Sequence, residues 1–183
     1  MQIIGIRRED KTDQERRAPL APKHVKELSK SGDVKFLVER SPSRAYKNEE
    51  YEQAGAELVD ELPKCDLVIG VKEIPIPRLH PDTPQLFFSH TIKGQEYNMP
   101  LLQKILDINA TLIDYEVVVD DSGKRVIFFG VQAGQAGMVN SLWALGKRWE
   151  SLGFSTPLAL LNQAKNYDRL DGAKDAIRKA GEI

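Results

Sequence analysis

The sequence predicts an α/β fold, in which helices flank a mostly parallel sheet and a helical arm follows at the C-terminal end. Short apolar runs alternate with stretches of helical period along most of the chain, an order typical of parallel sheets. Beyond residue 131 only helical periodicity remains. We therefore expect an α/β domain over residues 1–130 and a helical arm over residues 131–183.

Apolar runs predict the strands. The run in 66–73 is continuous, as expected for a strand that is covered on both faces. Two β-branched runs flank Asp-Asp-Ser-Gly within 117–130, which predicts a hairpin. The other expected strands cover residues 3–6, 34–39, 85–90 and 111–116.

Helical periodicity and end residues predict the helices. Pro22 begins one segment and Gly32 follows it, whereas Asn48 suits the cap position of the next. The helices are expected at 22–32, 48–56, 97–110, 138–153, 155–167 and 171–181, with Leu101, Leu102, Ile105 and Leu106 on one side of the third. In the arm, Leu142, Trp143, Leu145 and Trp149 lie at helical spacing, and we expect them to form an exposed apolar surface through which the chain self-associates.

Composition excludes several classes of protein. The 183 residues carry a formal net charge of −1, which does not favour binding to nucleic acid or to an anionic membrane. The apolar runs are too short to span a membrane, and the N-terminal residues lack a secretory signal pattern. A single cysteine, Cys65, cannot form an internal disulfide, so we expect a cytoplasmic or organelle-matrix protein.

Polar and charged residues follow the predicted strands. Lys72 and Glu73 end one apolar strand and His90 ends the next, while Arg17 lies in the charged loop after the first strand. Asp114-Tyr115-Glu116 ends the last strand of the predicted sheet. Because ligands bind beyond the carboxyl ends of parallel strands, these side chains could share one site. Arginine, lysine and histidine together suit proton transfer on an anionic carbonyl substrate.

Each of these residues also has a plainer interpretation. Arg17 could be a solvated loop residue, and Lys72 could extend a partly buried stem toward water. His90 could be a half-buried histidine with its hydrogen bonds satisfied, and Glu73 could merely pair with a neighbouring cation. The segment 130–138, "GVQAGQAGM", does not follow the G-x-G-x-x-G spacing, so we interpret its glycines as close packing at a helix start. The three dispersed histidines and one cysteine do not match a zinc site.

Five segments of the chain together resemble a known family. They are "GIRREDKTDQERRAPLAP", "LVIGVKE", "FFSHTIKGQEYNMPLL", "LIDYE" and "FFGVQAGQAGM". With these segments the chain is similar to the N-terminal region of lysine–ketoglutarate reductase and saccharopine dehydrogenase, in the alanine dehydrogenase and transhydrogenase N-terminal superfamily. The resemblance covers residue 3 to about 180 and implies a flavodoxin-like domain.

The resemblance implies a reaction and a role for each matching residue. Lysine and 2-oxoglutarate condense to an imine, which a nicotinamide cofactor, NAD or NADP, reduces to saccharopine. Lys72 and His90 match the acid–base residues, and Arg17 matches the arginine that holds a substrate carboxylate. The remaining positions near the substrate are Glu15, Glu73, Lys93 and Gln95.

The sequence departs from the family in one respect. Family members continue into a dinucleotide-binding domain, whereas this chain ends at Ile183 without a glycine fingerprint. The resemblance therefore implies a substrate half that binds no cofactor itself, is inactive alone, and meets a cofactor domain in cis or in trans. The apolar surface of the arm adds the expectation of a homo-oligomer. Two alternatives remain open: a domain of an alanine-dehydrogenase-like enzyme for a 2-oxo acid, and a free-standing domain that binds an amino acid or a partner without catalysis.

Overall fold

The computed structural model describes residues 1–182, and the chain divides into two compact units. The first comprises Met1–Ile127 and the second begins at Phe128, a few residues before the boundary expected at 130/131. The final residue of the expected arm, Ile183, lies outside the described residues.

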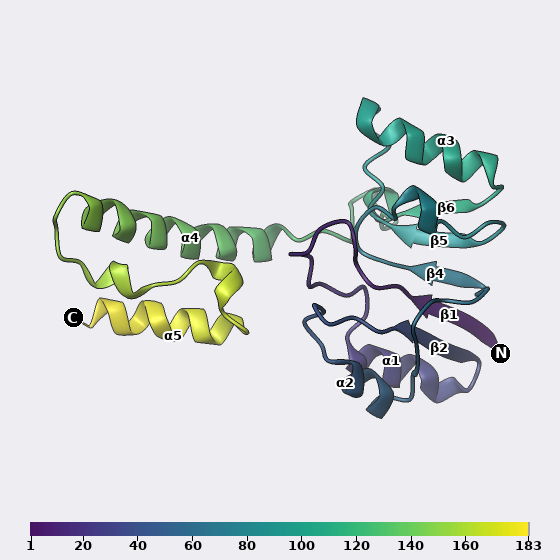
Figure 1. The fold of residues 1–183 in the computed structure, drawn as a ribbon, viewed down its shortest axis with the longest axis horizontal. Helices are drawn as coiled ribbons and strands as arrows, with labels where there is room; N and C mark the ends of the chain where they lie inside the picture. The colour runs from purple at the N-terminus through teal and green to yellow at the C-terminus, as the bar shows by residue number, and fades with distance from the viewer. Residues whose placement is uncertain (183) are drawn as a thin grey trace. The chain divides into compact units, whose positions relative to one another are not determined.

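Six parallel strands form the sheet of the first unit, in the order β3-β2-β1-β4-β5-β6 (Figure 1). The predicted α/β class is confirmed. The chain starts in the middle of the sheet, builds outward through β2 and β3, and then returns to place β4 on the other side of β1. The strands are β1 (Gln2–Ile6), β2 (Val34–Glu39), β3 (Glu57–Val59), β4 (Leu67–Ile69), β5 (Pro84–Phe87) and β6 (Thr111–Asp114).

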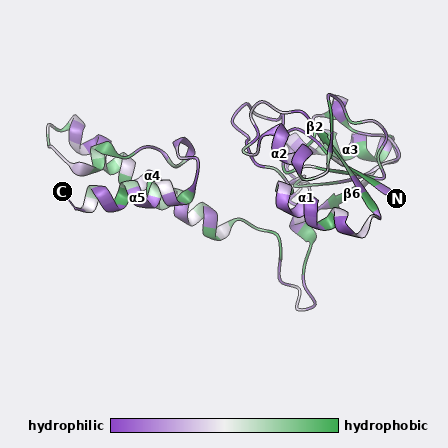
Figure 2. Ribbon diagram, turned by 90° about the horizontal axis from the view of Figure 1, so that it is seen from below, coloured by the Kyte–Doolittle hydropathy of each residue, from purple (hydrophilic) through white to green (hydrophobic). Residues whose placement is uncertain are grey.

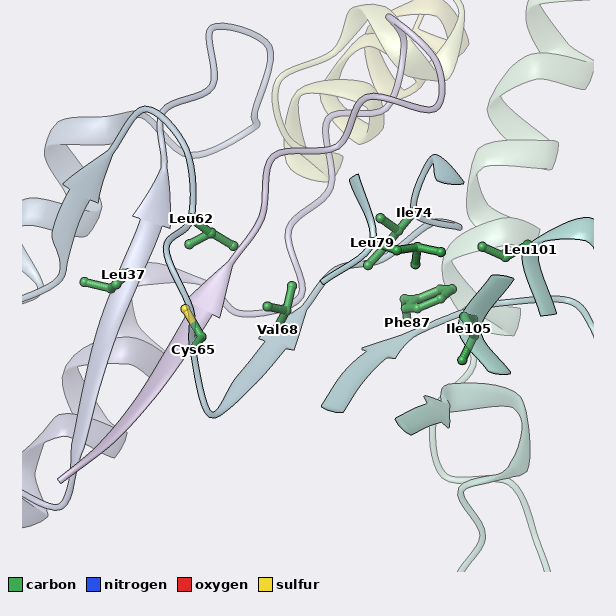
Figure 3. Packing of buried hydrophobic residues seen from close by; sticks show 9 residues of the cluster. All are labelled: Leu37, Leu62, Cys65, Val68, Ile74, Leu79, Phe87, Leu101 and Ile105. Atoms are coloured by element: carbon green, nitrogen blue, oxygen red, sulfur yellow. The ribbon is translucent and has the colours of Figure 1, made fainter. Parts of the chain in front are cut away.

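Side chains that alternate along the strands build a core on each face of the sheet. On one face, Phe36 and Val38 of β2 join Val25 of helix α1 and Tyr51 of helix α2. On the other face, Leu37 belongs to a second cluster that includes Leu101 and Ile105 of helix α3; Figure 3 shows this cluster, whose members are Leu37, Leu62, Cys65, Val68, Ile74, Leu79, Phe87, Leu101 and Ile105. The helices are α1 (Pro22–Leu28), α2 (Asn48–Gln53) and α3 (Met99–Asp107). Coloured by hydropathy, β2 and β6 are largely apolar, whereas α1 and α2 are mostly hydrophilic (Figure 2).

Several expected elements differ in extent. Strand β3 was not expected, because its three residues directly follow a helical stretch. Strand β4 ends at Ile69, although Gly70 N donates to Leu86 O and Phe88 N to Val71 O, so sheet hydrogen bonds continue past it. The expected cap Asn48 is the first residue of α2, and its Oδ1 accepts from Ser41 N.

Leu106 was expected on the same side of its helix as Leu101 and Ile105, but these two are buried whereas 64% of Leu106 is exposed. Leu101 and Ile105 form the buried stripe of α3, and Leu106 lies one position beyond it.

The expected hairpin is present as a turn without regular strands. Val119 and Arg125 form an antiparallel bridge, and Gly123 has φ of 79°. Asp120 Oδ1 accepts from Ser122 N and from Lys124 N, so the turn is closed by the aspartate carboxylate as well as by glycine.

The second unit consists of two helices and two 3₁₀ turns: α4 (Gly130–Ser151), η5 (Pro157–Leu160), η6 (Ala164–Asn166) and α5 (Leu170–Gly181). The stretch 155–167, expected as a helix, contains only the two short turns. The expectation of close packing at Gly134 and Gly137 is wrong for the described residues, because a Cβ at either position would meet no atom within 4 Å. Close packing occurs instead at Gly146, where a Cβ would lie 2.5 Å from the Leu158 backbone.

Candidate active site at the carboxyl edge of the sheet

The candidate site residues follow the strands on either side of the point where strand order reverses. The loop after β1 carries Glu15 and Arg17, and the segment after the neighbouring β4 carries Lys72 and Glu73. His90 follows β5, the next strand along. The carboxyl end of an open sheet at such a reversal is the usual position of a ligand site.

Arg17 and Glu15 form a two-pronged ion pair. Arg17 Nε donates to Glu15 Oε1 over 2.8 Å, and Nη2 donates to Oε2 over 2.6 Å. Only 8% of the Glu15 side chain is exposed, against 45% for Arg17. The Arg17 hydrogen bond lowers the pKa of Glu15, and the same bond raises the pKa of Arg17. A substrate carboxylate at Arg17 would therefore share the guanidinium with Glu15.

The main chain at Lys72 is held by a carboxylate from another loop. Glu9 Oε1 accepts from Val71 N over 2.7 Å, and Oε2 accepts from Lys72 N over 2.9 Å. Lys72 itself is half-buried, and its charge lowers the pKa of Glu15 slightly, after the larger effect of Arg17. The Lys72 side chain thus lies within electrostatic range of the Arg17–Glu15 pair.

Glu73 points to a second basic residue of the first loop. Its Oε1 lies 3.0 Å from Lys11 Nζ. Burial raises the pKa of Glu73, but hydrogen bonds from its own backbone N–H and from Lys11 outweigh burial and lower it overall, and His90 contributes in the same direction. Lys11 and His90 therefore both favour the ionised form of Glu73.

His90 occupies an unusual backbone conformation. Its φ is 54°, in the left-handed region that residues other than glycine seldom adopt. The ring of Phe88 stacks on the imidazole, with 6.2 Å between centroids. His90 Nδ1 lies 3.3 Å from Glu116 Oε2, and 31% of the histidine side chain is exposed. The imidazole is thus oriented by Glu116 on one nitrogen.

A buried carboxylate supports the conformation at His90. Asp114, at the end of β6, accepts hydrogen bonds from both the backbone N–H and the hydroxyl of Ser89, which is fully buried. Its other oxygen accepts from Glu116 N over 2.8 Å, and Asn98 Nδ2 donates to Ser89 O over 3.0 Å. Asp114 therefore holds both Ser89, which precedes His90, and Glu116, which pairs with His90.

Lys93 and Gln95 lie at the outer part of the site. Lys93 Nζ is 3.4 Å from Glu116 Oε1, and Arg125 Nη1 is 3.7 Å from the same atom. Gln95 Oε1 accepts from the Tyr97 hydroxyl over 2.7 Å. Lys11 Nζ lies 5.9 Å from the centre of the Tyr97 ring, so Tyr97 joins these residues to the first loop.

Taken along the edge from β1 to β6, carboxylates alternate with basic side chains. Ion pairs join Arg17 to Glu15, Lys11 to Glu73 and His90 to Glu116. In addition, the charge of Lys72 lowers the pKa of Glu15, and that of His90 lowers the pKa of Glu73. Such a row can hold a substrate with both charged amine and carboxylate groups, and it supplies a lysine and a histidine for proton transfer.

From the sequence, Asp114 and Glu116 were expected at this edge without an assigned role, whereas Glu9 and Lys11 were not singled out. Glu9 and Lys11 lie in the charged loop after β1, Asp114 is the last residue of β6, and Glu116 follows that strand. Glu116 and Asp114 stand in the polar segment that ends the last strand, which is the pattern that selected Lys72 and His90. Glu9 and Lys11 could not be separated by sequence from the other charges of their loop.

The glycine-rich segment 130–138 does not form a turn between a strand and a helix. The glycines at 130, 134 and 137 lie within α4 rather than in a turn between a strand and a helix, where a pyrophosphate would bind. Over residues 1–182, no three His, Cys, Asp or Glu side chains gather as a metal site would require. In the same part of the chain, no helix combines the length and apolar character needed to cross a bilayer.

Comparison with known proteins identifies the family of the chain. The model of the family "Alanine dehydrogenase/PNT, N-terminal domain" matches residues 5–136. The chain is 45% identical over 179 residues to the mitochondrial alpha-aminoadipic semialdehyde synthase of Rattus norvegicus, covering 98% of this chain and 19% of that protein. It is 40% identical over 185 residues to the Arabidopsis thaliana protein of that name, covering 98% of this chain and 17% of the other.

A third relative is the saccharopine dehydrogenase [NAD(+), L-lysine-forming] of Neurospora crassa. It is 33% identical over 198 residues, which cover 99% of this chain and 50% of that protein. The chain thus spans about a sixth to a half of the length of these three relatives.

Two solved structures share the fold. An L-alanine dehydrogenase superposes with a TM-score of 0.56 at 23% identity, over 78% of this chain and 37% of that one. The transhydrogenase of Sinorhizobium meliloti superposes with a TM-score of 0.58 at 18% identity, over 81% of this chain and 43% of that one. The chain therefore belongs to the alanine dehydrogenase/PNT N-terminal domain family and is homologous to the N-terminal part of alpha-aminoadipic semialdehyde synthase.

Proposed function

We propose that this chain is the substrate-binding and acid–base half of an oxidoreductase of lysine metabolism, which interconverts saccharopine with lysine and 2-oxoglutarate. The row of alternating charges at the carboxyl edge of the sheet carries the proposal, since it contains Lys72 and His90 on neighbouring strands. The 45% identity to alpha-aminoadipic semialdehyde synthase supports this substrate. Saccharopine bears several carboxylates and a secondary amine, which suits such a row.

In this proposal the residues have distinct tasks. Arg17 binds a substrate carboxylate with the same guanidinium group that pairs with Glu15. Lys93 and Gln95 line the outer part of the site. Lys72 and His90 exchange protons with the amine nitrogen and with the oxygen that leaves or enters as water. Glu15 and Glu73 balance the positive charges beside them, so that neither base faces an uncompensated cation.

The proposal assigns no cofactor site to this chain. The cofactor of the related saccharopine dehydrogenases, NAD(+), would be supplied by a dinucleotide-binding domain in cis or in trans. We expect the chain alone to bind neither NADH nor NADPH specifically and to show no dehydrogenase activity. Calorimetry that found micromolar binding at 1:1 stoichiometry would contradict this expectation.

Calorimetry with substrates tests the proposal itself. The 183-residue chain should bind saccharopine, or lysine and 2-oxoglutarate, more tightly than pyruvate or L-alanine. Arg17→Ala should weaken binding more than Lys72→Met or His90→Gln, because its contact exists before any proton moves. In a preparation with turnover, the last two changes should lower kcat by about 10²–10⁴-fold. Preference for pyruvate would favour the alanine-dehydrogenase-like alternative, and binding without any effect of these changes would place the site elsewhere.

A further inference from the structure

Glu9 is a buried carboxylate to which the proposed reaction assigns no task. Only 3% of its side chain is exposed, and burial raises its pKa, against the opposing effect of the bonds from Val71 and Lys72. A buried charge of this kind contributes little to stability on its own, and hydrophobic replacements are often neutral or stabilising. Its hydrogen bonds to Val71 and Lys72 therefore point to a role other than stability.

The two oxygens of Glu9 accept from the consecutive amides of Val71 and Lys72, just after the end of β4. Consecutive amides of a regular strand point to opposite sides, so the same carboxylate can reach both only because the chain bends at Val71 and Lys72. Val71 O still accepts from Phe88 N, so this peptide is anchored to β5 on one side and to Glu9 on the other. These contacts fix the direction in which the Lys72 side chain leaves the backbone.

The surroundings of Glu9 are shaped to hold it. Arg7 Nη1 lies 3.6 Å from Glu9 Oε2, and only 3% of the Arg7 side chain is exposed. At Gly70, a Cβ would lie 2.9 Å from Arg7 Cδ and 3.3 Å from Glu9 Oε1. Both side chains therefore cross the strand in the space that glycine leaves, which is a second, independent sign that the Glu9 position is specific.

We propose that Glu9 is a positioning residue, which holds the Val71–Lys72 peptide so that the Lys72 ammonium faces the substrate. The functional part of this inference rests on the proposed function, whereas the structural part does not. Glu9 itself touches no reacting atom in this scheme. Its effect on the reaction passes through Lys72 alone.

Amide hydrogen exchange of the 183-residue chain tests the structural part. Glu9→Gln keeps the shape of the side chain but leaves one oxygen where two accepted, so exchange at Val71 or Lys72 should speed up about tenfold or more. The amide of Phe88, which bonds to Val71 O, should change far less. The matched control, Glu61→Gln at an exposed position, should leave all three amides unchanged. Unchanged exchange at both Val71 and Lys72 in the Glu9 variant would overturn the proposal.

NMR of the lysine side chains tests the functional part. After reductive methylation with ¹³C, the Lys72 resonance is identified by its loss in Lys72→Met. Its response to added saccharopine should shrink in Glu9→Gln, while the responses of Lys11 and Lys93 persist. A uniform change in all three lysines would mean a merely structural role and would overturn the positioning role. If no lysine responds to saccharopine even in the unaltered chain, the proposed function fails, and the exchange data still decide the role of Glu9.

A second variant covers the case in which Glu9→Gln does not fold. Gly70→Ala adds a methyl group against Arg7 and Glu9 without removing any hydrogen-bonding group. It should speed exchange at Val71 and Lys72 and weaken the Lys72 response in the same way. A folded Gly70→Ala chain with both readouts unchanged would equally refute the inference.

Discussion

Replacing Asp114 by asparagine removes one hydrogen-bond acceptor from the side chain that holds Ser89 and Glu116 beside His90. The carboxylate accepts from Ser89 N and Ser89 Oγ on one oxygen and from Glu116 N on the other. The asparagine amide has the same shape but only one accepting oxygen, so in either orientation its NH₂ group faces a donor. Only 6% of Asp114 is exposed, so water cannot easily replace the lost bond.

The cost follows from these contacts. Leaving a buried donor without an acceptor costs about 1–3 kcal/mol, and bonds to an ionised acceptor are about twice as strong as neutral ones. We therefore expect Asp114→Asn to lower the free energy of unfolding by about 2–4 kcal/mol. For a chain of this length that corresponds to a fall in Tm of about 4–16 °C. Since natural domains have only about 5–15 kcal/mol in total, the variant should still fold.

Urea and thermal unfolding at pH 7, followed by far-UV circular dichroism, measure this change. The exposed Asp121→Asn is the control, and it should alter stability by less than about 0.5 kcal/mol. A ¹⁵N spectrum at 25 °C should also show displaced amides at Ser89, His90 and Glu116 in the Asp114 variant. If Asp114→Asn were as stable as the control, the carboxylate would not be the support that its hydrogen bonds suggest.

Three further changes test other parts of the structure. Arg17 lowers the pKa of Glu15 in the folded chain below the ordinary 4.5, so the pair stabilises the fold above pH 4.5, and this stability is lost as the pH falls through the folded-state pKa. Glu15→Gln should therefore reduce the loss of unfolding free energy that urea titrations measure between about pH 5 and pH 2. Gly146→Ala places a Cβ within 2.5 Å of the Leu158 backbone, so we expect a loss of about 1–3 kcal/mol, read by tryptophan fluorescence because both tryptophans lie in α4. Tyr51→Phe removes a hydroxyl that donates over 2.6 Å to a backbone carbonyl of the first loop, so stability should fall by about 1 kcal/mol and the absorbance titration should lose a phenol with pKa about 12.

The architecture of the sheet could be predicted because periodicity is a local property. Short runs rich in apolar residues, such as those of β2 and β5, are typical of buried strands when they alternate with helical stretches, and polar residues mark their ends. Lys72 and His90 could be placed at one edge for the same reason. Strand β3 escaped prediction because three residues are too few to show a period.

The contacts within the site could not be predicted because they join loops far apart in sequence. Glu9 binds the amide of Lys72, and Lys11 pairs with Glu73, yet each is one charge among many in its loop. The pairing of Arg17 with Glu15 is local, but the sequence could not show that the guanidinium is already occupied. For Gly146, the tight neighbour is Leu158, across a turn whose path depends on the fold.

The position of β6 at the border of the sheet makes the site sensitive to partial opening. Within residues 1–182, only β5 pairs with β6. Asp114 is the last residue of β6, and Glu116 lies in the turn that follows. A border strand detaches with less free energy than a central one, since it breaks a single ladder. A fluctuation that released β6 would at once free Ser89, the imidazole and Lys93 from their carboxylates, while β1, β2 and β4 stayed paired. The ion pairs of the candidate site would then be lost in a molecule that circular dichroism still reports as folded, so on heating we expect substrate binding to be lost before global melting.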